Sequence, residues 1–141
     1  MTFQYISLEA QTGRALLANA GGCSPYYYSA KDKTVKELTL KGPALGTFKR
    51  AKFEEIELNF EPGDAIVFYT DGIVEARDES GKEFTYERML ETVKNNYNTD
   101  AQKFYNGIKE EYLLHLGKGL PDDDLTLIVL VFNEPKTDIY L

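Results

Sequence analysis

The chain has 141 residues, of which 43% are hydrophobic and 13% aromatic, enough for one domain with a buried core. Its formal net charge of −7 argues against binding to nucleic-acid phosphates, and no apolar run approaches the roughly 20 residues that span a bilayer. One cysteine, Cys23, and the lack of a cleavable signal favour a reduced, cytoplasmic protein with neither nucleic acid nor membrane as a partner.

The first half of the chain predicts strands and turns. Alternation of apolar and polar residues, with turn residues between, predicts strands at residues 3–9, 14–20, 26–28, 35–40 and 53–60. Three consecutive tyrosines, Tyr26 to Tyr28, are also compatible with a stacking platform for bases or peptides. We favour a half-buried strand, because tyrosine is a good strand former.

An apolar run, Ala65 to Tyr69, shows no polar alternation, which indicates a strand covered on both faces. Asp71 follows this strand, and Gly72 behind it admits a tight turn and a close approach of backbone to ligand. An aspartate at this position suits a hard cation, although an isolated Asp-Gly pair is more often only a turn.

A second acidic cluster mirrors the first. Asp122, Asp123 and Asp124 enter the apolar strand Leu125 to Phe132. If the two strands are antiparallel neighbours, this cluster and Asp71 lie at the same sheet edge. Converging carboxylates repel one another and need a cation between them, so we expect the carboxylates of Asp71 and Asp123 to lie roughly 4–6 Å apart.

Two helices are predicted between the acidic clusters. Thr85 is placed to cap a helix that runs to about Asn96, and Thr99 or Asp100 opens a second helix that ends at Gly117. His115 is expected to interact with the end of the second helix. Residues 1–134 show no internal boundary, and residues 135–141 form a polar tail.

These motifs carry a family resemblance. Thr70-Asp-Gly-Ile-Val-Glu-Ala76 and Asp122-Asp-Asp-Leu-Thr126 resemble the metal-dependent PPM-type serine/threonine phosphatases, in their SpoIIE-like bacterial branch. Further similarity lies in Ala18-Asn-Ala-Gly21, Gly42-Pro-Ala-Leu-Gly46 and Leu58-Asn-Phe-Glu-Pro-Gly-Asp64. The resemblance implies an α+β fold, an antiparallel β-sandwich edged by helices, that is incomplete at the N-terminus. The family's N-terminal half, with its aspartate-glycine metal motif, has no counterpart here.

The resemblance also implies a site. It gives Asp71 and Asp123 as catalytic metal ligands for Mn²⁺ or Mg²⁺, with Gly72, Asp124 and Thr126 in support. Glu75 belongs to the motif with a supporting role at most. The branch commonly has histidine and asparagine where this chain has Gly22 and Cys23, and we interpret Cys23 as a small buried hydrophobe and not a nucleophile.

The implied function is dephosphorylation of seryl or threonyl phosphate on a protein by a metal-activated water, with an anti-sigma-factor antagonist as the branch's usual substrate. The alternative is a non-catalytic, degenerate phosphatase module that binds a partner in a partner-switching pathway. A simple Ca²⁺ site at residues 122–124 ranks last, because the calcium-loop ligand spacing is missing.

Self-association is a further expectation. The strands at 65–69 and 125–131 both need cover on two faces, and in the resembling fold part of that cover comes from the absent half. We therefore expect the chain to form homo-oligomers through uncovered sheet.

Overall fold

The structure, a computed structural model, describes residues 1–119, 121 and 123–134. The predicted polar tail at 135–141 lies outside these residues. The elements in chain order are β1 Phe3–Leu8, β2 Arg14–Ala20, β3 Tyr26–Ser29, β4 Thr34–Glu37, β5 Glu55–Asn59, β6 Ala65–Tyr69, α1 Asp71–Val74, α2 Tyr86–Asn96, α3 Ala101–Leu116 and β7 Leu127–Val131.

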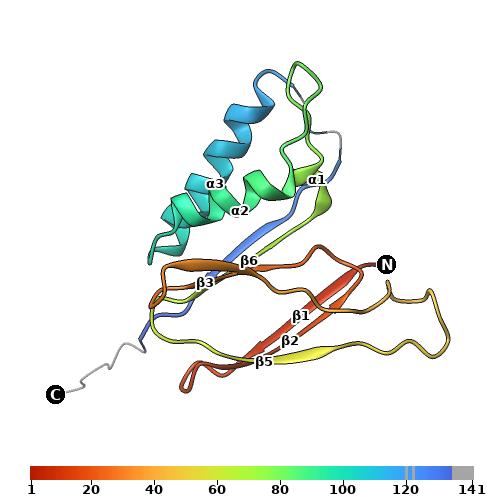
Figure 1. The fold of residues 1–141 in the computed structure, drawn as a ribbon, viewed down its shortest axis with the longest axis vertical. Helices are drawn as coiled ribbons and strands as arrows, with labels where there is room; N and C mark the ends of the chain where they lie inside the picture. The colour runs from red at the N-terminus through yellow and green to blue at the C-terminus, as the bar shows by residue number, and fades with distance from the viewer. Residues whose placement is uncertain (120, 122, 135–141) are drawn as a thin grey trace.

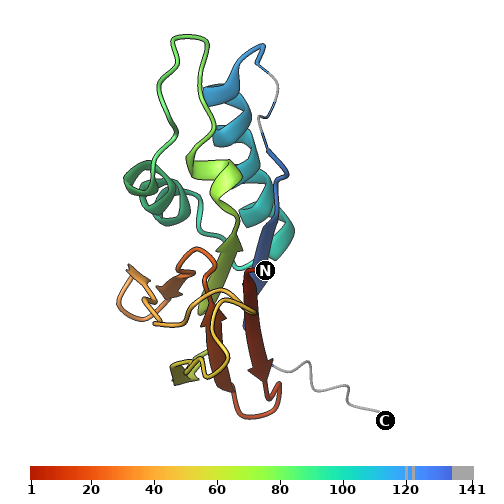
Figure 2. The ribbon, with the colours of Figure 1, turned by 90° about the vertical axis from the view of Figure 1, so that its right-hand side faces the viewer.

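The strands form two antiparallel sheets that pack face to face. The order is β1-β2-β5 in one sheet and β4-β3-β6-β7 in the other. Helices α2 and α3 cover the face of the second sheet that points away from the first, so the molecule has three layers (Figure 1 and Figure 2). The predicted α+β sandwich edged by helices is confirmed. No helix in the described ranges has the length and hydrophobicity needed to cross a bilayer.

Strand β6 lies at the centre of these layers, and all five of its residues are buried. Its alternate side chains Ala65, Val67 and Tyr69 join the core beneath the helices. Ile66 and Phe68 join the core between the two sheets. The expectation that this strand needs cover from outside the chain is wrong, because the β1-β2-β5 sheet supplies it.

Strand β7 differs from β6, although its sequence is equally apolar. It stands at the edge of its sheet and pairs only with β6 among the described strands. Ile128 is 54% exposed and its neighbours are half-buried. This partial exposure agrees with the expectation that β7 needs more cover than the chain supplies, and the outer edge of β7 pairs with no other described strand.

The helix boundaries follow the predicted caps. The Thr85 hydroxyl oxygen accepts a hydrogen bond from the Arg88 amide at 3.4 Å, and α2 begins at Tyr86, directly after Thr85. The Asp100 carboxylate accepts from the amides of Gln102 and Lys103, at 3.0 and 3.2 Å, at the start of α3. Gly117 ends α3 with φ of 61°, a conformation that favours glycine.

His115 lies in the last turn of α3, as expected, but its ring nitrogens bond to residues outside that helix. The side chain is buried, and its Nδ1 lies 2.8 Å from Nη1 of Arg88 on α2. Its Nε2 lies 3.1 Å from the carbonyl oxygen of Ala76. His115 therefore connects both helices to the segment that follows α1.

Candidate functional site

The pairing of β6 with β7 brings the two acidic motifs to the same end of the sheet. The strands are antiparallel, and Tyr69 lies opposite Leu127. Beyond that pair, the Thr70 amide donates to the Thr126 carbonyl at 3.1 Å, and the Thr126 amide donates to the Thr70 hydroxyl at 2.9 Å. The sequence made the convergence conditional on antiparallel neighbours, and the structure meets that condition.

Gly72 is the point of contact between the two motifs. A Cβ atom at Gly72 would lie 2.8 Å from the Asp124 carbonyl oxygen and 3.5 Å from Cβ of Asp123. The Asp-Gly pair forms the first turn of helix α1, where the Glu75 amide donates to the Asp71 carbonyl at 2.9 Å. Glycine is thus required here by close packing of the second acidic motif.

The carboxylates of Asp71 and Asp123 are both exposed. Each accepts a hydrogen bond from the amide that follows it, at 3.1 Å from Gly72 and 2.7 Å from Asp124, which leaves further oxygen lone pairs free. Asp122 lies outside the described residues. Among the described residues no group of three histidines, cysteines or carboxylates is placed to hold a metal ion.

Two clefts flank the motif. Asp71 lines a cleft of about 350 Å³, and Asp123 lines a smaller one of about 210 Å³. Glu75 borders both clefts. The family resemblance assigned Glu75 a supporting role at most, and its position between the two clefts depends on the turn of helix that α1 adds after β6.

The loop at residues 21–23 forms part of the wall of the larger cleft. Asn19, which is buried, holds this loop: its side-chain amide donates to the Gly22 carbonyl, and its side-chain oxygen accepts from the Gly22 amide, both at 2.9 Å. The Gln4 side chain donates to the Cys23 carbonyl. The positions at which this chain departs from the branch therefore lie in the same cleft as Asp71.

Cys23 is half-buried in this wall. Burial, followed by the negative charge of Asp71, raises the pKa of the Cys23 thiol. Because the thiolate is the nucleophilic form, this environment opposes nucleophilic catalysis by Cys23. The result agrees with the sequence interpretation that Cys23 is not a nucleophile, but sequence spacing did not predict that it lines the cleft.

Tyr26 and Tyr28 of the tyrosine run pack in the core beneath the helices. Tyr26 is buried and stacks on Tyr69 with ring centroids 5.3 Å apart, and Tyr28 stacks on Tyr97 at 3.7 Å. The Tyr26 hydroxyl donates to the Tyr86 carbonyl at 3.0 Å, next to the cleft wall. The strand interpretation is confirmed, and the stacking faces are taken up by other rings of the chain.

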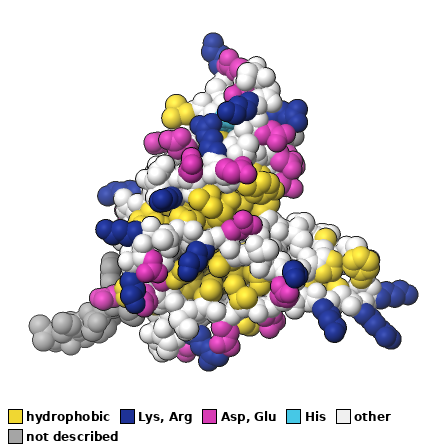
Figure 3. Space-filling model, in the orientation of Figure 1, with side chains coloured by type: hydrophobic (Ala, Val, Ile, Leu, Met, Phe, Trp, Pro, Cys, Tyr) yellow, Lys and Arg dark blue, Asp and Glu magenta, His cyan; other side chains and the backbone are white. Residues whose placement is uncertain are grey.

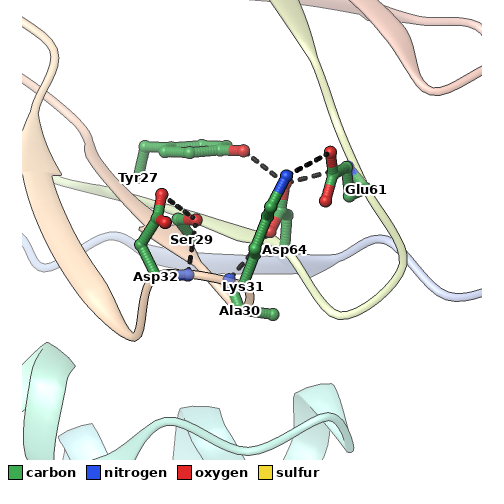
Figure 4. Close-up of polar contacts among 7 residues, drawn as sticks. All are labelled: Tyr27, Ser29, Ala30, Lys31, Asp32, Glu61 and Asp64. Carbon is green, nitrogen blue, oxygen red and sulfur yellow. Dashed lines mark hydrogen bonds and ion pairs between the residues drawn. The ribbon is translucent and has the colours of Figure 1, made fainter.

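A separate carboxylate, Asp64, lies at the other end of β6 (Figure 4). Its side chain is buried, with Oδ1 accepting from the Ala30 amide at 2.8 Å. Its Oδ2 accepts from the Glu61 amide at 2.8 Å and from the Tyr27 hydroxyl. Burial and the hydrogen bond to Asp64 raise the pKa of Tyr27. Asp64 therefore joins the turn before β6 to the end of β3.

Comparisons with known proteins agree with this architecture. The family model described as stage II sporulation protein E (SpoIIE) matches residues 1–133. Phosphoserine phosphatase RsbU of Bacillus subtilis (strain 168) is 32% identical over 132 residues, which cover 92% of this chain and 38% of RsbU. The chain spans between 20% and 38% of the length of the curated relatives that it matches.

Solved structures share the fold. The RsbU and RsbW domains of Rv1364c from Mycobacterium tuberculosis superpose with a TM-score of 0.76 at 24% identity, over 95% of this chain and 36% of that chain. The Mn-presoaked phosphatase domain of SpoIIE from Bacillus subtilis gives a TM-score of 0.71 at 16% identity, over 95% of this chain and 57% of that chain. From the family match, this chain belongs to the SpoIIE family of PPM-type phosphatase domains.

Proposed function

We propose that the chain acts as part of a metal-dependent serine/threonine phosphatase, which hydrolyses phosphoserine or phosphothreonine on a protein. The observation that carries this proposal is the packing of Gly72 against Asp123 and Asp124, since it brings two acidic motifs together from opposite ends of the chain's second half. The similarity to RsbU, a phosphoserine phosphatase, supports the same reaction class.

Asp71 and Asp123 would hold Mn²⁺ or Mg²⁺. The donor set fits a hard cation, because both side chains offer free carboxylate oxygens and the described neighbours include no competing soft-ligand cluster. When bound, such an ion lowers the pKa of a coordinated water and neutralises negative charge on the phosphoryl group.

Gly72, Asp124 and Thr126 would support these ligands through the backbone. Gly72 lets the two motifs approach, and the Asp124 carbonyl accepts from the Thr70 hydroxyl at 3.3 Å. The backbone of Thr126 holds the two motifs together, because its carbonyl accepts from the Thr70 amide and its amide donates to the Thr70 hydroxyl. The chain's own part in the reaction is to fix the direction of both carboxylates and to receive the phosphorylated side chain in the cleft beside Asp71.

A non-catalytic binding module is the second candidate. It is favoured by the small ligand set, because two carboxylates hold a divalent ion weakly. Such a module would bind the same phosphoprotein without hydrolysing it.

Hydrolysis of a phosphoserine peptide with Mn²⁺ tests the first proposal. We expect low activity from this chain, which Asp71→Asn abolishes and which a chelator removes. Asp32→Asn is the matched control, because Asp32 is a carboxylate on a turn remote from the acidic motifs, bonded to Ser29. Activity that survives Asp71→Asn or the chelator would mean a different mechanism.

Adding an upstream segment, such as the corresponding part of RsbU, separates the two candidates. The enzyme proposal expects turnover to rise when this segment adds further metal ligands. The binding-module proposal expects the peptide to bind with no turnover in either form.

The substrate we propose is a phosphoprotein of a partner-switching pathway, in particular an anti-sigma-factor antagonist.

We further propose that the edge of β7 that pairs with no other described strand allows self-association of the chain, because unpaired strand edges can pair with further strands. Sedimentation at micromolar concentration measures this directly. A sharp 16.0 kDa species would contradict the proposed self-association.

A further inference from the structure

The loop at residues 46–53 projects from the end of the sandwich, between the N-terminal region and β5 (Figure 1). Three exposed cations, Lys49, Arg50 and Lys52, lie in this loop, and no acidic residue separates them. Figure 3 shows cationic side chains gathered with hydrophobic ones on this projection, at the right of the view. The charge of the loop is opposite to the net charge of −7 of the chain. The negative net charge of the whole chain conceals this local cluster.

None of the three cations takes part in an ion pair or side-chain hydrogen bond with another described residue. Two aromatic side chains flank them: Phe48 is 65% exposed and Phe53 is 39% exposed. Exposed cations alone are usually just a solvated surface. Aromatic side chains left in water beside unpaired cations are instead typical of an interaction surface.

The base of the loop is fixed beside the larger cleft. A Cβ at Gly42 would lie 2.3 Å from the Asn19 carbonyl oxygen, and one at Gly21 would lie 2.8 Å from the Ala44 amide nitrogen. The Leu45 amide donates to the Met1 carbonyl at 2.8 Å. Because Gly21 and Thr2 line the cleft that contains Asp71, the loop rises from the border of that cleft.

The cleft itself repels an acidic ligand. Asp71 and Glu75 both line it, and none of the residues around it is a lysine or an arginine. A phosphorylated segment is itself strongly negative, so without a bound cation the side chains of the cleft do not attract it. The loop at 46–53 supplies unpaired positive charge at the adjoining position.

We propose that residues 46–53 form a docking arm for an acidic segment of the phosphoprotein whose phosphorylated side chain enters the cleft. Lys49, Arg50 and Lys52 attract the acidic side chains, and Phe48 packs against an apolar side chain of the same segment. This inference rests on the proposed function, since it names the class of protein substrate for that site.

Binding measured without turnover tests the arm. Two fluorescein-labelled phosphoserine peptides of equal length are compared by anisotropy in the presence of EDTA, one flanked by aspartates and a leucine and one by neutral polar residues. We expect the acidic peptide to bind more tightly, with an affinity that falls as salt rises. Because no metal or hydrolysis is involved, inactivity of the chain leaves this test unaffected.

The variant K49E/R50E/K52E reverses the charge of the arm, and we expect it to lower the affinity for the acidic peptide by about tenfold or more at low salt. The control is K33E/K94E/K109E, which changes three exposed lysines elsewhere by the same total charge. Equal losses in the two variants would overturn the proposal, because only the net charge would matter.

Phe48→Ala tests the aromatic contact against Leu114→Ala, which removes another exposed apolar side chain, on α3. We expect only Phe48→Ala to weaken binding of the acidic peptide, by a few-fold. Equal binding of the acidic and neutral peptides would contradict the arm. Arm-dependent binding to vesicles of anionic lipid, with no preference for the acidic peptide, would also overturn it in favour of a membrane surface.

Discussion

Two aspartates flank strand β6, and their environments are opposite. Asp64, before the strand, is 2% exposed, and its carboxylate accepts three hydrogen bonds. Asp71, after the strand, is exposed and its side chain accepts one hydrogen bond, from the next amide. The sequence places both next to the same apolar run. The difference indicates that Asp64 stabilises the fold, whereas Asp71 keeps its oxygens free for a ligand.

The largest expected effect is on stability at Asp64. In Asp64→Asn the new NH₂ group must face at least one of the donors from Ala30, Glu61 and Tyr27, so a buried donor loses its acceptor. We expect a loss of about 2–3 kcal/mol in the free energy of unfolding, measured by denaturant titration. For Asp71→Asn we expect less than about 0.5 kcal/mol, as for most surface changes. Equal losses for the two variants would remove the distinction between them.

Gly72→Ala sharpens the comparison at the Asp71 end. Alanine favours a helix, but its Cβ would lie 2.8 Å from the Asp124 carbonyl oxygen. We therefore expect a loss of about 1–3 kcal/mol and weaker Mn²⁺ binding, because the two motifs are forced apart.

Gly81→Ala is the comparison variant, since Gly81 has φ of +85° and no atom lies within 4 Å of a Cβ there. It should lose about 1 kcal/mol through backbone strain alone and leave Mn²⁺ binding unchanged. Unchanged Mn²⁺ binding in Gly72→Ala would show that the close packing of Gly72 against Asp124 is not needed for metal binding.

Asp78 is partly exposed, and like Asp64 its carboxylate accepts several hydrogen bonds. Bonds from the Ser80 hydroxyl at 2.6 Å and from the amides of Ser80 and Lys82 lower the pKa of Asp78 to about 2 from 3.8. Because the folded pKa lies below the unfolded one, its small stabilising effect is present above pH 3.8 and is lost as the pH falls towards 2.

Carbon-13 NMR of the Asp78 carboxyl during an acid titration measures this pKa. We also expect Asp78→Asn to unfold at a slightly lower temperature than the parent at neutral pH and at the same temperature near pH 2. Titration of Asp78 at its ordinary pKa would show that hydrogen bonds at an exposed turn do not hold its charge.

Local signals predicted most of the elements. The apolar run of β6, the caps at Thr85 and Asp100 and the stop at Gly117 depend on neighbouring residues, and all are present in the structure. The antiparallel pairing of β6 with β7 was a condition of the expected site, suggested by the mirrored acidic ends, and the structure meets it. These features are local, or depend on a single pairing, so a pattern in one sequence can indicate them.

Features that depend on distant packing were missed. The β1-β2-β5 sheet covers β6, and nothing in the β6 sequence indicates which segment supplies that cover. The positions of Cys23 and Glu75 in the clefts depend on the loop at 21–23 and on the turn of helix α1. The buried role of Asp64 depends on donors from Ala30 and Tyr27, more than 30 residues earlier in the chain.

A crystal structure with Mn²⁺ tests the central claim most directly, because anomalous scattering locates the ion. We predict a peak between Asp71 and Asp123, with carboxylate oxygens from both side chains at about 2.1–2.5 Å and the two carboxylates roughly 4–6 Å apart. Loss of that peak in Asp71→Asn and its persistence in Asp32→Asn would complete the result. An ion bound elsewhere, or Asp71 and Asp123 facing separate clefts with no shared ion, would contradict the account.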